Sequence, residues 1–141
     1  MNKKIKNIIL KKNKSKIVSL TAYSKNIAKI LDKYCDIILV GDSMANVLYG
    51  HKNTHKINLE NIIQHTKSVK LGIKKSLLVV DMPKGTYKNA KIAERNATLV
   101  LKKTGCDAIK LESHKKNFKI IESLVKKKNT SYGSYWIHTS I

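Results

Sequence analysis

Several residue types are scarce in this sequence, and each shortage excludes a class of protein. The two cysteines, Cys35 and Cys106, form no CxxC pair, so neither a disulfide framework nor a cysteine zinc site is expected. No apolar run approaches the roughly 20 residues of a membrane-spanning helix. The charged start is followed only by the short apolar run 8–10, which is too short for a signal-peptide core. We therefore expect a reduced, cytoplasmic protein that does not contact a membrane.

Acidic residues and arginine are scarce as well. Nine Asp and Glu stand against 29 Lys and Arg, which gives a formal charge of +20. Such a charge often marks a nucleic-acid-binding protein. However, Arg95 is the only arginine, and proteins that read phosphates or bases favour its planar guanidinium. The lysines are scattered and accompany many Ile and Asn, as AT-rich codon usage produces. We expect a lysine-covered surface without a nucleic-acid partner, and a basic nucleic-acid-binding α/β domain is the alternative.

With Pro83 as its single proline and no hairpin signal, the chain does not resemble an all-β protein. Short apolar runs alternate with segments whose apolar residues recur at helical spacing. We predict strands at 17–20, 37–40, 77–80 and 108–111, each followed by a helix. The helices cover 26–34, a segment from the N-cap Asn58 to the terminal Gly72, 90–101 and 118–125. The pattern predicts a parallel α/β fold.

Length restricts this fold further. A complete (β/α)8 barrel takes roughly 200–250 residues, so 141 residues predict the first four βα units of a truncated barrel. A small open doubly wound sheet is the alternative. We divide the chain into a Lys-rich, frayed N-terminal extension at 1–15, a partial barrel domain at 16–129 and a tail at 130–141.

Three of the four predicted strands are followed by an acid. Asp42, Asp81 and Glu112 come after the second, third and fourth strand, respectively. The carboxyl ends of parallel strands meet at one edge of the sheet, so these carboxylates should converge there. Three converging carboxylates repel one another unless a cation or proton is shared, and oxygen ligands suit Mg²⁺. The alternative is that each acid only caps the following helix.

Lys110 lies two residues before Glu112 in an otherwise apolar strand. Alternate residues of a strand share a face, so the two side chains should lie together. A buried lysine needs an acid or an anionic ligand, and a purely structural Lys110–Glu112 pair is the alternative. His51 and His65 show no metal-ligand spacing, so we interpret both as structural residues.

Taken together, these segments resemble ketopantoate hydroxymethyltransferase. No single motif carries the resemblance; the order and spacing of the whole set do. The matching stretches are Leu20-Thr21-Ala22-Tyr23, Ile38-Leu39-Val40-Gly41-Asp42-Ser43, Tyr49-Gly50-His51, His65-Thr66, Asp81-Met82-Pro83 with Tyr87, and Lys110-Leu111-Glu112.

The resemblance implies a (β/α)8 enzyme that moves a hydroxymethyl group from 5,10-methylenetetrahydrofolate to 3-methyl-2-oxobutanoate in pantothenate biosynthesis. It implies that Asp42 and Asp81 bind Mg²⁺ and contact the substrate, with Glu112 reaching the metal through water. It also implies that Ser43 and Lys110 bind the carboxylate of the keto acid, and that the intact protein is a homo-oligomer. The general base of the family, a Glu of the second half, has no counterpart here. We therefore expect no turnover from this chain alone.

The chain departs from the family pattern at four places. Ser24 replaces an Asp, Lys84 replaces a Phe, and 113–114 replace two glycines. The loop 52–56 is also unusual. We expect these changes to affect the substrate loops more than the metal site.

The tail is the largest departure. One allowed choice of codons for 130–141, read one base out of frame, encodes Pro-Val-Met-Gly-His-Ile-Gly-Tyr-Thr-Pro-Gln-Ser, which resembles the fifth strand of the family. We infer a frameshift near Asn129, and we expect the out-of-frame tail not to form a fifth strand with its apolar residues facing the core.

Overall fold

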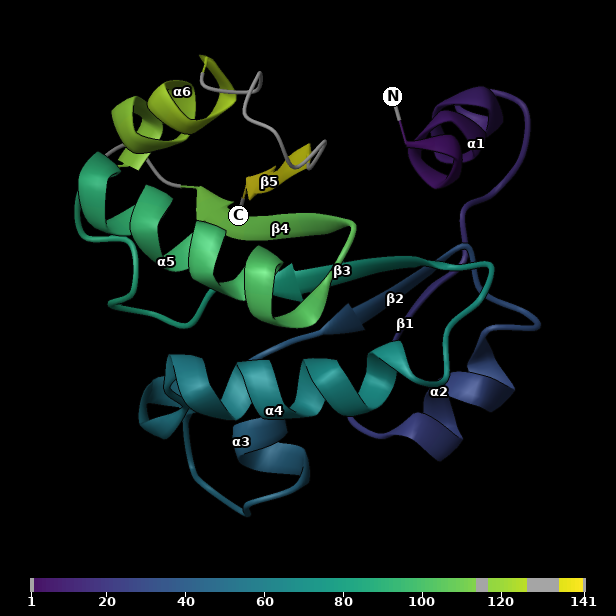
Figure 1. Ribbon diagram of the computed structural model, residues 1–141, viewed down its shortest axis with the longest axis horizontal. Coiled ribbons are helices and arrows are strands. Elements are labelled where there is room, and N and C mark those ends of the chain that lie inside the picture. The colour runs from purple at the N-terminus through teal and green to yellow at the C-terminus, as the bar shows by residue number, and fades with distance from the viewer. Residues whose placement is uncertain (1, 114–116, 127–134, 141) are drawn as a thin grey trace.

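The computed structural model describes residues 2–113, 117–126 and 135–140, which form a parallel five-stranded sheet with helices packed around it (Figure 1). The strands are β1 (Ser19–Thr21), β2 (Ile37–Val40), β3 (Leu77–Asp81), β4 (Ala108–Ser113) and β5 (Tyr135–Ser140). The helices are α1 (Lys3–Lys11), α2 (Lys25–Leu31), α3 (Met44–Val47), α4 (Leu59–Lys70), α5 (Ala90–Thr104) and α6 (Phe118–Lys126), with a 3-10 turn η1 (Thr54–Lys56). Within these ranges, none of the helices combines the length and apolar character that crossing a membrane requires.

The strand order distinguishes between the two predicted architectures. The strands lie in the order β1-β2-β3-β4-β5, and every neighbouring pair is parallel. Right-handed crossovers between successive neighbours place all the crossover helices on one face. A doubly wound sheet instead reverses its strand order at a switch point. The fold is therefore the first part of a barrel, as predicted, and not a doubly wound sheet.

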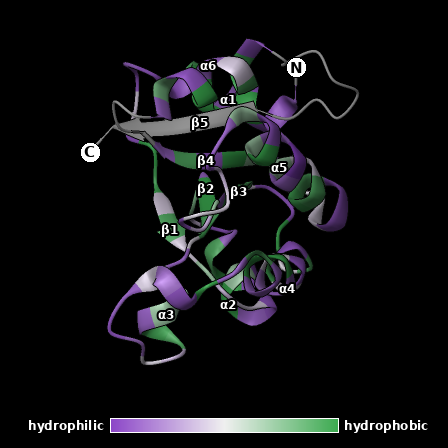
Figure 2. Cartoon of the chain, turned by 90° about the vertical axis from the view of Figure 1, so that its left-hand side faces the viewer, coloured by the Kyte–Doolittle hydropathy of each residue, from purple (hydrophilic) through white to green (hydrophobic). Residues whose placement is uncertain are grey.

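The two faces of the sheet belong to different cores. The larger core lies between the sheet and helices α2, α4, α5 and α6, and Figure 2 shows these helices carrying both hydrophobic and hydrophilic residues. The strand residues buried in it are Ile38, Val40, Leu78, Val80, Ile109 and Leu111. The intervening residues Leu77, Val79 and Ala108 form a second, smaller cluster. This alternation explains why β2 and residues 77–80 of β3 are all apolar, because both faces of these strands are covered.

The N-terminal segment forms a helix, so the prediction of a frayed extension is wrong. The Asn2 side chain caps α1 by accepting a hydrogen bond from the Lys4 backbone N–H. Ile5 is buried in the smaller cluster against β3 and β4, with Ile8 packed beside it. A nine-residue helix is marginal in isolation. Contact with the otherwise open face of the sheet supplies the burial that stabilises it.

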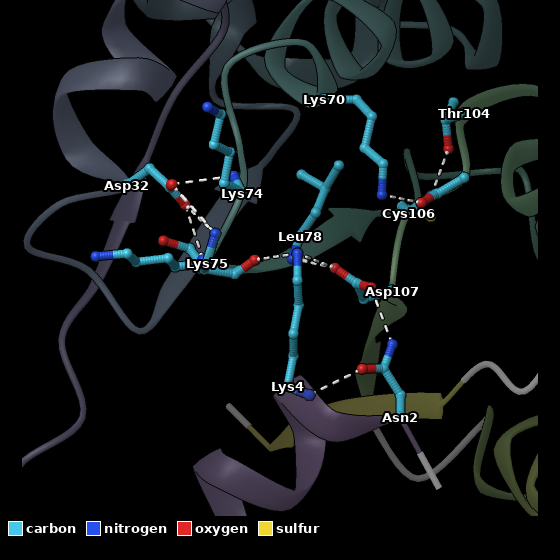
Figure 3. A network of polar contacts seen from close by, with 12 residues as sticks. Asn2, Lys4, Asp32, Lys70, Lys74, Lys75, Leu78, Thr104, Cys106 and Asp107 are labelled. Atoms are coloured by element: carbon cyan, nitrogen blue, oxygen red, sulfur yellow. Dashed lines mark hydrogen bonds and ion pairs between the residues drawn. The ribbon is translucent and has the colours of Figure 1, made fainter.

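Two aspartates fasten this helix to the N-terminal edge of the sheet. Asp107, directly before β4, accepts hydrogen bonds from the Leu78 backbone N–H at 2.9 Å and the Asn2 amide at 3.0 Å (Figure 3). Asp36, directly before β2, accepts from the Val18 backbone N–H at 3.0 Å and pairs with Lys11. Each carboxylate therefore joins a neighbouring strand to α1 at the edge opposite to Asp42, Asp81 and Glu112.

Gly72 has a different role from the one predicted. It follows α4, but it does not adopt the left-handed conformation of a helix-ending glycine, unlike Gly105 after α5 with φ of 62°. A Cβ at Gly72 would collide with the Lys25 carbonyl oxygen and lie 2.8 Å from the Lys29 backbone nitrogen. Glycine is therefore needed because the backbone after α4 lies directly against α2.

Replacing Gly72 by alanine is expected to lower the free energy of unfolding by about 1–3 kcal/mol, because rigid backbone atoms must move to admit the methyl group. Urea unfolding followed by circular dichroism measures this loss. The matched control is Gly41→Ala, since a Cβ there meets no atom nearer than the Ser43 hydroxyl at 3.5 Å. Equal midpoints for the two variants would contradict the close approach of α4 to α2.

The tail also differs from the prediction. Residues 135–140 form β5, which pairs with β4 in parallel from Ala108–Tyr135 to Ser113–Ser140. The tail therefore does form a fifth strand in its backbone, while the predicted absence of apolar residues facing the core concerns side chains outside the described part of the structure and stays a prediction. Strand pairing at the edge of β4 requires only main-chain hydrogen bonds, and Tyr, Trp, Ile and Thr favour strands. The out-of-frame origin of the tail stays a prediction, and residues 130–134 and 141 lie outside the described ranges.

Candidate metal and carboxylate site

The three predicted carboxylates follow adjacent strands at the carboxyl edge of the sheet. Asp42 lies just beyond β2, Asp81 ends β3, and Glu112 lies near the end of β4. These strands are neighbours and run parallel, so all three residues belong to one edge, as the sequence predicts. The three differ in burial: Asp81 is 6% exposed, Asp42 is half-buried and Glu112 is exposed. The site therefore has one buried acid flanked by two that reach solvent.

Asp81 is the most perturbed of the three acids. Its burial raises the pKa of the carboxyl group, the Lys110 ammonium lowers it, and the charges of Asp42 and Glu112 raise it again. The resulting pKa is about 6, against an ordinary value of 3.8. Only negative charges close to Asp81 can raise its pKa in this way. Asp42, Asp81 and Glu112 therefore share one electrostatic site.

Lys110 pairs with an acid, as a buried lysine requires, but this acid is Asp81 and not Glu112, the partner in the structural alternative. Its ammonium contacts the Oδ2 atom of Asp81, the residue directly opposite on β3, instead of Glu112 on its own strand. Residues opposite one another on neighbouring strands are about 4.8 Å apart, whereas residues two apart on one strand are separated by nearly 7 Å. Cross-strand register, which the sequence alone does not reveal, therefore decides the partner of Lys110.

Among the described residues, one observation supports the predicted site for a divalent cation, and another does not agree with three carboxylates enclosing it. The Oδ1 atom of Asp81 is buried and has no hydrogen-bond partner among the described residues, so it is available to a ligand. However, no three His, Cys, Asp or Glu side chains of the described ranges lie close enough together to enclose a metal ion. Mg²⁺ is commonly held by one or two carboxylates together with substrate and water oxygens. An open site of that kind is compatible with this arrangement.

Ser43 and two tyrosines complete the surroundings. The half-buried Ser43 hydroxyl lies 2.7 Å from the Tyr23 hydroxyl, which follows β1. Burial and the charges of Glu112, Asp81 and Asp42 raise the pKa of Tyr87 to about 12, so this phenol stays protonated. No role was predicted for Tyr23 or Tyr87, whose only signal in the sequence is their place in the stretches that resemble the family. Both bring hydroxyl groups to the carboxylate edge.

His65, which we interpreted as a structural residue, contacts the segment that follows β1 at the carboxyl edge of the sheet. Its ring on α4 lies between the Tyr23 backbone carbonyl, at 2.8 Å from Nδ1, and the Tyr49 hydroxyl, at 2.9 Å from Nε2. His51 instead stacks on the Tyr49 ring, with centroids 5.9 Å apart. His65 therefore holds the segments around Tyr23 and Tyr49 together, whereas His51 packs only on Tyr49 of its own segment.

Two of the departures from the family pattern contact one another. The Lys84 ammonium, after β3, lies 3.1 Å from Nε2 of His55 in η1. Both side chains are exposed. The unusual loop 52–56 and the Lys84 substitution are therefore coupled at the surface. Neither side chain contributes to the buried part of the site around Asp81. His114, of the departure at 113–114, lies outside the described residues.

Comparisons with known proteins agree with the resemblance. The family model described as ketopantoate hydroxymethyltransferase matches residues 2–131. A 3-methyl-2-oxobutanoate hydroxymethyltransferase of Pelagibacter ubique is 59% identical over 128 residues, covering 91% of this chain and 50% of that protein. The protein of the same name from Rhizobium etli is 46% identical over 112 residues, covering 79% of this chain and 41% of that protein. The chain thus spans about half the length of the curated relatives it matches.

A solved structure with a similar fold is a phosphonopyruvate hydrolase in complex with oxalate and Mg²⁺. Its TM-score is 0.71 at 12% sequence identity, and the match covers 99% of this chain and 53% of that one. At this identity the likeness concerns the fold, and it agrees with a partial barrel. The nucleic-acid-binding alternative finds no support in these matches. Since the family model spans nearly the whole sequence and the relatives are so similar, the chain belongs to the ketopantoate hydroxymethyltransferase family.

Proposed function

We propose that this chain supplies the metal and substrate-carboxylate part of a site for transfer of a hydroxymethyl group from 5,10-methylenetetrahydrofolate to 3-methyl-2-oxobutanoate. The observation that carries the proposal is the buried, unpartnered Oδ1 atom of Asp81 beside the Lys110 ammonium. A site that binds a 2-oxo acid needs a cation that contacts the ketone and carboxylate oxygens. It also needs a hydrogen-bond donor that balances the remaining negative charge of the carboxylate. A buried oxygen available to a cation and an ammonium donor at this edge of the sheet support both parts of the proposal.

Asp42 and Asp81 would hold Mg²⁺, with Glu112 contributing through water. Asp81 offers a free buried oxygen, and Asp42 is half-buried at the next strand end. When bound, the cation polarises the ketone and so acidifies the neighbouring C–H. The similar fold that holds oxalate and Mg²⁺ supports this assignment, since oxalate and a 2-oxo acid both present two adjacent oxygen-bearing carbons.

Lys110 and Ser43 would bind the carboxylate of the keto acid. The ammonium is a strong donor to carboxylates, and its pairing with Asp81 holds it at the site. The Ser43 hydroxyl adds a neutral donor from the neighbouring strand end. Tyr87 remains protonated beside the three acids and can donate as well. These residues bind and orient the substrate, and none is assigned as the general base.

Without an assigned base, we expect no useful turnover from the chain alone, because a positioned general base contributes about 10²–10⁴-fold. Binding is therefore the property to measure. Homo-oligomerisation, which the resemblance implies for the intact family, remains part of the proposal.

The proposal predicts that 3-methyl-2-oxobutanoate binds only when Mg²⁺ is present. Isothermal titration calorimetry with and without Mg²⁺ measures this. Ser43→Ala is expected to weaken binding about three- to tenfold, the value of one hydrogen bond. Ser123→Ala on α6 makes the same chemical change away from the site and should leave binding unchanged. Equal binding without the cation would refute the metal assignment, and a steeply salt-dependent affinity for DNA would favour the nucleic-acid alternative.

A further inference from the structure

Two separate hydrogen bonds, one to the backbone carbonyl of Tyr23 and one to its hydroxyl, connect α4 with Ser43 through residues that have no assigned role in the proposed reaction. The His65 ring, half-buried on α4, contacts the Tyr23 backbone carbonyl through Nδ1 at 2.8 Å. The Tyr23 hydroxyl in turn lies 2.7 Å from the Ser43 hydroxyl. The Tyr23 and His65 rings also meet edge to face, with centroids 6.4 Å apart. Tyr23 is therefore held by its backbone and by its ring.

The partners of His65 decide where its proton lies. A backbone carbonyl only accepts hydrogen bonds, so Nδ1 must carry the proton and donate it to Tyr23. In the neutral ring Nε2 is then an acceptor, and it receives the Tyr49 hydroxyl proton at 2.9 Å. The same reasoning applies to the Ser43 hydroxyl. If Ser43 binds a carboxylate, its own proton must go to that carboxylate, which only accepts, so the Tyr23 hydroxyl must donate to Ser43.

We propose that His65 and Tyr23 are positioning residues that direct the Ser43 hydroxyl proton toward an anionic, acceptor-only group of the ligand. His65 fixes the segment after β1, and Tyr23 occupies the acceptor lone pair of Ser43 with a donated proton. Ser43 is thereby left with its proton free for the ligand. The Tyr23 hydroxyl, the Ser43 hydroxyl and the ligand then form one series of donors, in which the bond from Tyr23 polarises the Ser43 hydroxyl and strengthens its own donation. The ligand class that it selects is a carboxylate. This inference rests on the proposed function of Ser43.

The first test needs no ligand. Nitrogen-15 NMR of histidine-labelled protein reports which ring nitrogen of His65 carries the proton, and His65→Phe assigns its signals. The expected result, at a pH where the ring is neutral, is protonation at Nδ1. Protonation at Nε2 would overturn the inference, because that tautomer cannot donate to the Tyr23 carbonyl.

The second test measures affinity for 3-methyl-2-oxobutanoate with Mg²⁺. Tyr23→Phe is expected to weaken binding about three- to tenfold. In a Ser43→Ala background the same change should have little further effect, because Tyr23 acts through Ser43. Additive losses would overturn the inference. Tyr34→Phe, at a tyrosine that is 73% exposed three residues beyond α2, is the matched control and should bind normally.

Two variants of His65 distinguish a role as a hydrogen-bond donor that positions Tyr23 from a role in packing alone. His65→Asn places an amide N–H where Nδ1 lies and should retain most of the affinity. His65→Phe keeps a ring without the donor and should match the loss seen in Tyr23→Phe. Equal losses in both variants would contradict the positioning role. If the unmodified chain binds no 2-oxo acid, the proposed function fails, and the tautomer of His65 still decides whether His65 donates to the Tyr23 carbonyl and so positions Tyr23.

Discussion

Replacing Asp32 by alanine is expected to lower the free energy of unfolding by about 3 kcal/mol, one of the largest effects in this chain. The buried carboxylate follows α2 and accepts hydrogen bonds from the backbone N–H groups of Lys74, Lys75 and Ser76, at 2.8–3.1 Å. Figure 3 shows Asp32 pointing into the segment that leads to β3. Its removal leaves three donors without their acceptor. Typical domains are stable by about 5–15 kcal/mol, so the loss is large.

Urea unfolding at neutral pH measures this loss. Asp32→Asn retains one acceptor oxygen and should lose less than Asp32→Ala. The control is Glu122→Ala, because Glu122 is exposed and pairs only with Lys126 on the same helix. If Asp32→Ala and Glu122→Ala unfold at the same urea concentration, Asp32 does not organise the entry to β3.

The pH dependence of stability provides an independent check on Asp32. Burial raises the pKa of this carboxyl group, but the hydrogen bonds from Ser76, Lys74 and Lys75 outweigh burial and hold the pKa below its ordinary value of 3.8. A lowered pKa means that the folded state favours the charged form. The stabilisation is therefore complete above the ordinary pKa and is lost as the pH falls through the lower, folded value. Asp32→Ala should flatten this acid limb of the curve.

Replacing Asp81 by asparagine is expected to reduce the Mg²⁺-dependent affinity for 3-methyl-2-oxobutanoate by about 100-fold or more, since a charged metal ligand is lost. The variant keeps the shape of the side chain but removes the charge that a cation would need. Glu60→Gln makes the same chemical change at an exposed acid on α4 and serves as the control. Calorimetry at neutral pH distinguishes the two variants. Unchanged affinity in Asp81→Asn would exclude Asp81 as a ligand.

Asp81 should also affect stability in the direction opposite to Asp32. Its pKa of about 6 lies above the ordinary 3.8, so the folded state favours the protonated form. Its contribution is complete below the ordinary pKa and is lost as the pH rises through about 6. Asp81→Asn should remove this decline. A buried acid that costs stability at neutral pH is typical of a functional site.

The sequence by itself determined the elements whose signals are local. The apolar runs of β2 and β3 and the helical spacing of α4 and α5 each lie within a single segment. The cap of α4 at Asn58 is local too, because its side chain accepts from Asn61, only three residues away. The acids at the carboxyl ends of β2, β3 and β4 could also be placed at one edge from sequence, because parallel strands put these ends together.

Only the tertiary structure decided which residues meet across the fold. The partner of Lys110 depends on the register of β3 and β4, and the need for glycine at Gly72 depends on the backbone of α2. The helix α1 is stabilised by packing on a face of the sheet that is built from residues some 70–100 positions away. His65 reaches Tyr23 across 42 positions. Periodicity records which face of an element is buried, but it carries no information about the register or closeness of distant partners, and those contacts decide how the site is assembled.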